Sequence, residues 1–194
     1  DKKDLEQVHA LQDAIKVSQA KAGEFVVPKW DQSSQKKVRD ALLVLGETVP
    51  NYNRAFGPKG AVDPVQHLIG TATGWGGNPS KDAIYLTGVA PKNDGKTVYR
   101  LNVKDVPVKS FWSVSVYNAD GYFQQNPYDA YSLNNLTAQK KADGSIDIQF
   151  GGCDGKIANC LPTTPGWNYT VRLYQPSDAI LNGKWTFPEP TAQP

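Results

Sequence analysis

The sequence predicts an α+β fold in which a helical N-terminal region precedes an antiparallel β-sandwich. Two observations lead to this class. After Gly74 the apolar period changes from helical to alternating, and the 17 glycines and 14 prolines fall mostly after residue 50, as expected for turns between short strands. Because 194 residues suit one domain and are too few for two ordinary ones, we expect one structural domain, with a helical region over 1–64 packed on a sandwich over 65–194.

About three helices are expected before the sandwich. The first would end at Gly23, since glycine favours a helix stop. Its apolar residues at helical spacing are Leu5, Val8, Leu11, Ile15 and Ala22. The second would start near Asp31 or Ser33, whose side chains accept bonds from free N–H groups, and would end at Gly46.

The third helix has the strongest start signal in the chain. In Asp63-Pro64, aspartate caps the helix, and proline fits the first turn because its missing N–H would be unbonded there. The helix would end near Gly74. Its expected buried residues are Val65, Leu68, Ile69 and Ala72.

Five later segments are rich in β-branched and aromatic residues and are predicted to be strands. They cover residues 83–87, 97–103, 111–117, 145–150 and 168–174. Turn sequences that contain Asp-Gly or Pro-Gly pairs join several of them, which is typical of hairpins. The acidic residues of such turns usually bond their own backbone, so we do not expect them to be catalytic.

Composition and charge exclude several classes of protein. The formal net charge is +2 with acids and bases mixed, whereas nucleic-acid binding calls for clustered lysine and arginine. No apolar run approaches the length that a transmembrane helix needs. The chain contains no methionine and starts at Asp1, which suggests a processed product whose signal peptide has been removed.

The two cysteines also indicate an exported protein. Cys153 and Cys160 bracket a short loop, and a disulfide there would contribute about 2.5 kcal/mol in the chain-entropy model. The competing interpretation is a two-thiolate metal site, but neither histidine lies nearby in sequence to complete it. A disulfide favours the periplasm or the cell exterior, so we expect an exported protein.

Motifs for catalysis and cofactors are absent from the sequence. It has no Gly-x-Ser-x-Gly elbow, and its only histidines, His9 and His67, lie on predicted helices, where histidine is more often structural than catalytic. We predict no metal and no cofactor, and we lean towards a protein that is not an enzyme.

Three predicted strands each combine an apolar face with a polar one. If these strands are neighbours, the polar faces would form a groove with two guanidinium groups and aromatic edges, which suits a carboxylate, a phosphate or a sugar. Its residues would be Arg100, Ser113, Ser115, Tyr117, Thr170, Arg172 and Tyr174. The alternative is that one sheet face simply meets water.

Several motifs together resemble the bacterial family called domain of unknown function 1214. The similarity runs through residues 65–190 in order. The motifs include residues 74–79, 82–85, 99–101, 111–114, 116–121, 171–176 and 181–185. The resemblance implies a jelly-roll-like β-sandwich and no established reaction. Many relatives carry a preceding domain of unknown function 1254, where this sequence has only a short helical region.

Three functions stay open at this point. The leading hypothesis is an exported envelope protein that binds a small polar or anionic ligand or a glycan. Its candidate ligand-binding residues are Trp75, Tyr85, Arg100, Ser113, Tyr117, Arg172 and Tyr174. The second is a histidine-independent hydrolase or lyase that uses tyrosine, arginine and a carboxylate. The third is a structural or protein-interaction domain, whose protein partner the sequence does not identify.

Overall fold

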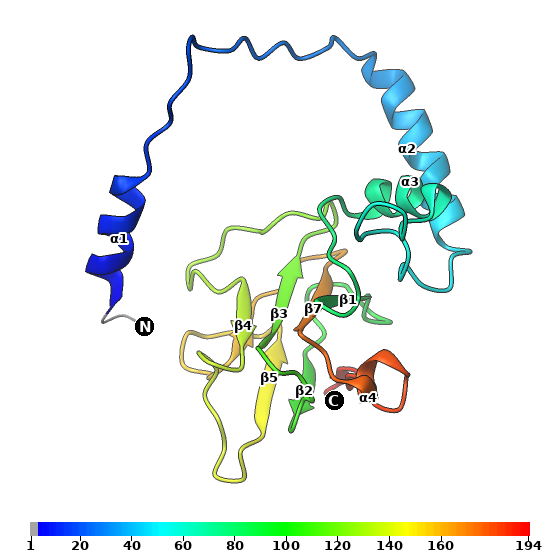
Figure 1. The fold of residues 1–194 in the computed structure, drawn as a ribbon. Helices are drawn as coiled ribbons and strands as arrows, with labels where there is room; N and C mark the ends of the chain where they lie inside the picture. The colour runs from blue at the N-terminus through cyan, green and yellow to red at the C-terminus, as the bar shows by residue number, and fades with distance from the viewer. Residues whose placement is uncertain (1–3) are drawn as a thin grey trace. The chain divides into compact units, whose positions relative to one another are not determined.

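The computed structural model describes residues 4–194 (Figure 1). The predicted processed start at Asp1 lies outside these residues. The chain divides into two compact units, one up to Val38 and one from Arg39 to Pro194. The predicted division at residue 64, with the helices packed on the sandwich, stays a prediction. Among residues 4–194, no helix has both the length and the apolar character needed to cross a bilayer.

The first two helices carry no buried residues. Helix α1 (Leu5–Ala14) ends at Ile15, whose backbone is extended, so the prediction that it would continue to Gly23 was wrong. Without tertiary contacts to hold them, β-branched residues such as Ile15 and Val17 favour extended backbone. Helix α2 (Gln32–Gly46) confirms its prediction.

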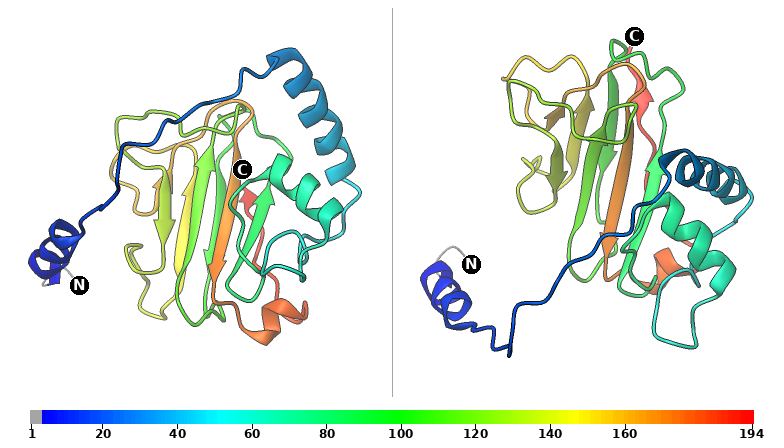
Figure 2. Two further views of the ribbon diagram at one scale, coloured as in Figure 1. Left: turned by 45° about the horizontal axis from the view of Figure 1, so that its top comes forward. Right: turned by 90° about the horizontal axis from the view of Figure 1, so that it is seen from above.

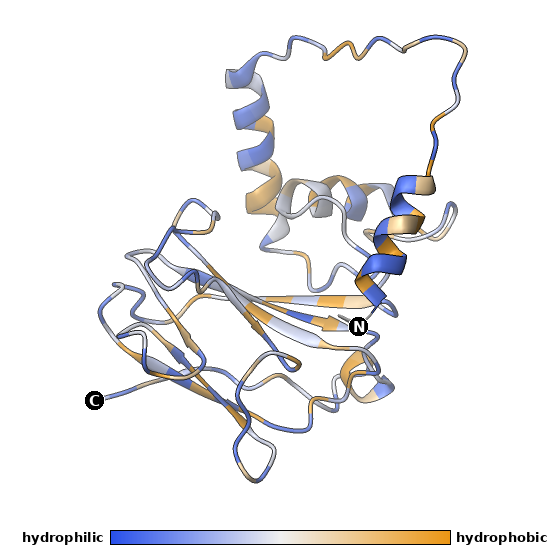
Figure 3. Ribbon diagram, turned by 90° about the vertical axis from the view of Figure 1, so that its left-hand side faces the viewer, coloured by the Kyte–Doolittle hydropathy of each residue, from blue (hydrophilic) through white to orange (hydrophobic). Residues whose placement is uncertain are grey.

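The capping residue of α2 is one of the two that the sequence suggested. The side chain of Asp31 accepts a hydrogen bond of 2.8 Å from the backbone N–H of Ser34. Figure 3 shows the change in character along α2, from a hydrophilic first half to a hydrophobic second half. The boundary between the two compact units falls within this helix.

Helix α3 (Pro64–Thr73) also confirms its prediction. The Asp63 side chain accepts hydrogen bonds from the N–H groups of Val65 and Gln66, both at 3.0 Å. Its predicted buried face was partly wrong, because the side chains of Val65 and Leu68 are 66% and 56% exposed.

The face of α3 that is buried packs against the preceding loop. Ile69 and Gly70 are buried, and a Cβ atom added at Gly70 would lie 2.9 Å from that of Ala55. Glycine at this position therefore allows the close approach. Nδ1 of His67 lies 2.7 Å from the carbonyl oxygen of Ala55, and its ring meets Phe56 edge-on. This histidine joins the helix to its loop.

The five predicted strands are all present. They are β1 (Ala83–Gly88), β2 (Tyr99–Val103), β3 (Trp112–Tyr117), β5 (Ile146–Phe150) and β7 (Asn168–Tyr174). Four short elements were not predicted: β4 (Ser132–Asn134), β6 (Cys160–Leu161), α4 (Asp178–Leu181) and β8 (Thr191–Ala192).

Residues 4–194 form two four-stranded sheets. Sheet A has the order β1-β7-β3-β4, and sheet B has the order β6-β5-β2-β8. All pairs are antiparallel except β5 with β6. The sheets lie face to face (Figure 2), which confirms the predicted α+β class with an antiparallel β-sandwich.

The core lies between the two sheets. Alternate residues of β2, β3, β5 and β7 point inward, in agreement with the apolar faces that the alternation predicted. Sheet A contributes Trp112, Val114, Val116, Tyr169, Val171 and Leu173, and sheet B contributes Tyr99, Leu101, Val103, Ile146, Ile148 and Phe150. Each fully buried aliphatic side chain stabilises the fold by about 1.5–3 kcal/mol. The residues between these point outward and form the two outer faces.

Candidate functional site

The outward-pointing residues of sheet A bring most of the candidate residues together. In the antiparallel register, Arg172 on the central strand β7 lies opposite Tyr85 on β1 and Ser113 on β3. Residues directly opposite each other point to the same face of a sheet. We call this surface the Arg172 face. It consists of Tyr85, Ser113, Ser115, Tyr117, Thr170, Arg172 and Tyr174.

The guanidinium of Arg172 is held by two hydroxyl groups. Its Nη1 donates to Oγ of Ser115 at 3.0 Å, and its Nη2 donates to Oη of Tyr117 at 2.6 Å. The central carbon of the guanidinium lies 5.9 Å from the centroid of the Tyr117 ring. Ser115 donates its own proton to Oγ of Ser132 at 3.0 Å, so its oxygen is free to accept from Arg172. The side chain is therefore fixed in orientation.

The charge of Arg172 has no carboxylate partner among the described residues. Hydroxyl oxygens and an aromatic ring orient the cation without neutralising it. Guanidinium has five N–H donors, and the hydrogen bonds to Ser115 and Tyr117 use two of them. The others are available to a bidentate anion.

Aromatic side chains flank the cation on both sides. Tyr117 stacks on Phe123 with ring centroids 5.0 Å apart and an angle of 6° between the planes. At the opposite end of β3, Tyr174 stacks on Phe111 with centroids 4.4 Å apart. Phe123, which is 51% exposed, was missed in the sequence because it lies in an irregular segment without alternation.

Tyr85 and Trp75 extend the aromatic surface at the β1 side. Tyr85 is 41% exposed, and its hydroxyl oxygen accepts a hydrogen bond of 2.6 Å from the side-chain amide of Asn78. Trp75 is 86% exposed and lies in the loop that leads to β1. A ligand-binding role for either residue remains a prediction.

Arg100 does not share this surface. It lies on β2 in sheet B and points away from the core on the other side of the sandwich. Its Nε donates to the side-chain oxygen of Gln149 at 3.4 Å. The predicted groove with two arginines required that β2 be a neighbour of β3 and β7, and the sheet order separates them. The sequence alternation identifies outward positions but not the sheet to which they belong.

The Arg172 face is shallow. The hollow at its Tyr117 end, bordered also by Asn126 and Tyr131, has a volume of about 10 Å³. Such a space holds about one water molecule. Pockets that enclose small molecules are many times larger. The surface is therefore suited to a ligand that lies across it.

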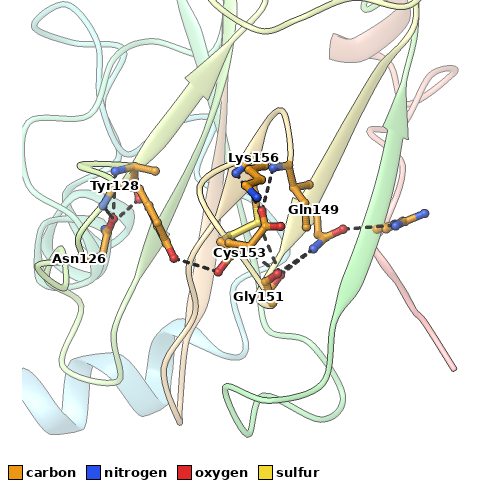
Figure 4. The surroundings of a disulfide bond; sticks show 12 residues. Asn126, Tyr128, Gln149, Gly151, Cys153 and Lys156 are labelled. Carbon is orange, nitrogen blue, oxygen red and sulfur yellow. Dashed lines mark hydrogen bonds between the residues drawn. A yellow bond between two sulfur atoms is a disulfide. The ribbon is translucent and has the colours of Figure 1, made fainter.

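The predicted disulfide between Cys153 and Cys160 is present, with the Cα atoms 5.7 Å apart. Its loop supports the segment 118–131, which carries Phe123. The hydroxyl of Tyr128 donates to the carbonyl oxygen of Cys153 at 3.1 Å (Figure 4). Asn126 accepts hydrogen bonds from the N–H groups of Tyr128 and Ala130, both at 3.1 Å. The disulfide loop thus anchors the segment that forms one wall of the Arg172 face.

Groups that commonly carry acid–base or metal chemistry lie elsewhere. Burial raises the pKa of Tyr169, but this ring packs in the core. Hydrogen bonds from Ser145 lower the pKa of Asp143, which bonds its own turn as predicted. Within residues 4–194, no three His, Cys, Asp or Glu side chains are grouped so that they could hold a metal ion.

Comparison with one solved structure supports the fold. The crystal structure of the VPA0106 protein from Vibrio parahaemolyticus is 23% identical, with a TM-score of 0.65, and the match covers 87% of this chain and 47% of that one. An uncharacterized protein from Burkholderia cenocepacia is 15% identical, with a TM-score of 0.33, and the match covers 82% and 48% of the two chains. The match thus spans about half the length of each of these proteins.

Comparison with protein families matches a large part of the sandwich to one family. Residues 84–178 match the family described as "Protein of unknown function (DUF1214)". This range is shorter than the similarity noted in the sequence over residues 65–190, and it contains β1 from its second residue onward, the inner strand β7 and Arg172. No curated protein matches the chain. Through residues 84–178, the chain belongs to the DUF1214 family.

Proposed function

We propose that this protein is an exported protein that binds an acidic glycan across the Arg172 face. The observation that carries the proposal is the state of Arg172. Its guanidinium is oriented by Ser115 and Tyr117, and among the described residues it has no carboxylate partner. An oriented cation with free donors is suited to a carboxylate or sulfate group of a ligand.

The neighbouring side chains favour a sugar as the carrier of that anion. A pyranose has an apolar C–H face that packs on aromatic rings and a rim of hydroxyl groups that form hydrogen bonds. The stacked pairs Tyr117–Phe123 and Phe111–Tyr174 offer the first kind of contact. The hydroxyl groups of Tyr85 and Tyr117 offer the second, whereas Ser113 and Ser115 on the same face are buried.

The shape of the surface favours a chain of sugars over a single one. The aromatic pairs belong to opposite ends of β3, and Phe111 and Tyr117 are six residues apart, or about 20 Å at about 3.4 Å per residue. Arg172 lies between them along the sheet. A ligand that meets both pairs and the cation must therefore be extended.

The disulfide supports export. Cys153 and Cys160 are joined, and such bonds persist in oxidising compartments such as the periplasm and the cell exterior. Glycans are abundant in both places, so the proposed location and the proposed ligand agree.

The enzyme alternative lacks a comparable observation. An enzyme of this kind needs Arg100 and Arg172 in one concave site, beside a carboxylate or a tyrosine whose pKa is shifted. Arg100 and Arg172 belong to different sheets, and the tyrosine with the raised pKa, Tyr169, faces the core. We therefore propose binding without catalysis.

Affinity electrophoresis tests the proposal. The purified protein is run in native gels that contain polygalacturonate, an acidic polysaccharide, or a neutral galactan. We expect the acidic gel to slow the wild-type protein and the neutral gel to leave its mobility unchanged. Arg172→Gln should restore the mobility, and Arg100→Gln, which removes the same charge from sheet B, should not.

Two results would count against this function. If the neutral galactan slowed the wild-type protein as much as polygalacturonate does, charge would have no role in glycan binding. Equal loss in Arg100→Gln and Arg172→Gln would mean that net charge, and not the Arg172 face, controls the interaction. A melting curve for each variant establishes that the fold is intact.

A further inference from the structure

A cavity of about 190 Å³ lies at one end of the sandwich, away from the Arg172 face. Its lining includes the last residue of β2 and the first residues of β3 and β5, strands that are labelled in Figure 1. At about 30 Å³ per water molecule, it has room for about six waters or one small solute. Its floor is made by the buried residues Val103, Trp112 and Ile146, so the cavity reaches the edge of the core between the sheets.

The walls of the cavity carry hydrogen-bonding groups. The Asn135 side-chain oxygen accepts a bond of 3.1 Å from the N–H of Trp112, which leaves its amide donors available. Ser110 lies on the rim. Asp105 also lines the cavity, and its backbone has a φ of 50°, a left-handed conformation that aspartate tolerates better than most residues. No hydrogen bond among the described residues uses its carboxylate.

Two lysines on the cavity lining supply positive charge. Lys104 follows β2 directly, and Lys140 comes from the loop before β5. Neither forms a close ion pair with a described residue, whereas the adjacent Lys141 pairs with Asp147 at 2.6 Å. The charge of Lys104 contributes to the lowered pKa of Asp143, after the hydrogen bonds from Ser145, so Asp143 balances this lysine in part. The cavity thus combines two cations without close ion pairs, one free carboxylate and neutral hydrogen-bonding groups around a small apolar floor.

We propose that this cavity is a second binding site, for a small hydroxylated anion such as a sugar acid or a sugar phosphate. The anionic group contacts Lys104 and Lys140. Hydroxyl groups of the ligand donate to the carboxylate of Asp105 and accept from the amide of Asn135. The volume excludes an oligosaccharide, so the ligand differs in size from the one proposed for the Arg172 face.

Isothermal titration calorimetry tests the site with gluconate and glucose 6-phosphate, which separate a carboxylate from a phosphate ligand. Glucose serves as the neutral probe. We expect one or both anions to bind the wild-type protein and glucose to give no heat. Lys104→Gln combined with Lys140→Gln should weaken binding about tenfold or more, since two charge-assisted contacts are lost. Lys104→Arg with Lys140→Arg should retain it.

Matched controls locate the effect. Lys96→Gln with Lys156→Gln removes the same charge from exposed positions outside the cavity lining and should leave the affinity unchanged. Arg172→Gln should also leave it unchanged, so failure of this site is distinct from failure of the proposed glycan site. Absence of binding by both anions, or equal affinity in the Lys104→Gln, Lys140→Gln variant, would overturn the proposal.

Discussion

Each outer face of the sandwich carries one arginine on an inner strand, but the side chains around the two arginines differ. Arg172 and Arg100 both lie on inner strands of four-stranded sheets and both point outward. On sheet B, Asp147 shares the face with Arg100, and the positive charge of Arg100 helps to lower the pKa of that carboxyl after the larger effects of Lys141 and Asn102. On sheet A, Arg172 meets hydroxyl groups and a ring.

The difference indicates what makes an arginine available to a ligand. A nearby carboxylate balances the charge of Arg100 in part, so an added anion would gain little there. Serine and tyrosine hydroxyls orient Arg172 and leave its charge uncompensated. We infer that the neighbours on the face, and not the residue type or its exposure, decide which of the two sheets can bind an anion.

The largest expected effect comes from the disulfide, which joins the two regions. It belongs to β6 of sheet B, yet its loop holds Tyr128 and thereby the wall of the Arg172 face. Cys153→Ser with Cys160→Ser should lower the unfolding free energy by about 2.5 kcal/mol. For a protein of this size the melting temperature should fall by about 5–10 °C, which calorimetry measures. Glycan binding should weaken as well.

Tyr128→Phe is the matched control for the disulfide. It keeps the covalent bond and removes the hydrogen bond to Cys153. We expect a small change in melting temperature and a loss of glycan affinity that is part of the loss in the double serine variant. An unchanged melting temperature without the disulfide would contradict the entropic contribution.

A carboxylate added beside Arg172 should make sheet A resemble sheet B. Ser132 is exposed and bonded to Ser115, which in turn contacts Arg172. Ser132→Asp should weaken binding of an acidic glycan about tenfold, because the cation is then partly neutralised. Thr191→Asp, opposite Arg100 in the register, is the control and should have no effect. If both variants lost the same affinity for the glycan, the difference between the two sheets would not explain anion binding.

Removal of the Tyr117 hydroxyl should have a smaller effect. Tyr117→Phe keeps the ring and its stacking on Phe123 but removes one of the two groups that orient Arg172. A net contribution of about 1 kcal/mol for such a bond corresponds to about fivefold weaker binding. Titration calorimetry with an acidic oligosaccharide measures the change, and stronger binding by the variant would contradict the orienting role.

The smallest effect concerns a turn between the two sheets. Hydrogen bonds from the N–H groups of Thr97 and Lys96 lower the pKa of Asp94 to about 2. Because the folded state lowers this pKa below the ordinary 3.8, the stabilisation is present above about pH 4 and is lost as the pH falls through 2. In Asp94→Asn, thermal melts between pH 4 and 2 should depend less on pH. If the melting temperature of Asp94→Asn fell with pH as steeply as that of the wild-type protein, Asp94 would not contribute to the acid sensitivity.

The strands were predictable because their alternation is strong. Residues 168–174 were predicted as a strand, and β7 has the same bounds. The short strands β4, β6 and β8 have two or three residues each, too few for a period, and their pairing partners define them. The first helix was predicted too long, because its apolar spacing continues past Ile15 although no residue there is buried.

The candidate site was only partly predictable, for two physical reasons. Alternation identifies the outward residues of each strand, but strand order depends on pairings distant in the sequence, so Arg100 was grouped with Arg172. Phe123 lies in a segment without a period, where the Asn118 side chain bonds the N–H groups of Asp120 and Tyr122. Its place beside Tyr117 follows from that turn and from the Tyr128 anchor.

The most direct test of the central claim is to map an acidic oligosaccharide onto the two faces by amide NMR shifts. A titration of the isotope-labelled wild-type protein with oligogalacturonate reports every residue whose surroundings change. We expect shifts at Arg172, Tyr117 and Phe123, with the amides around Arg100 unchanged. Shifts centred on Arg100, or no shifts on sheet A, would contradict it.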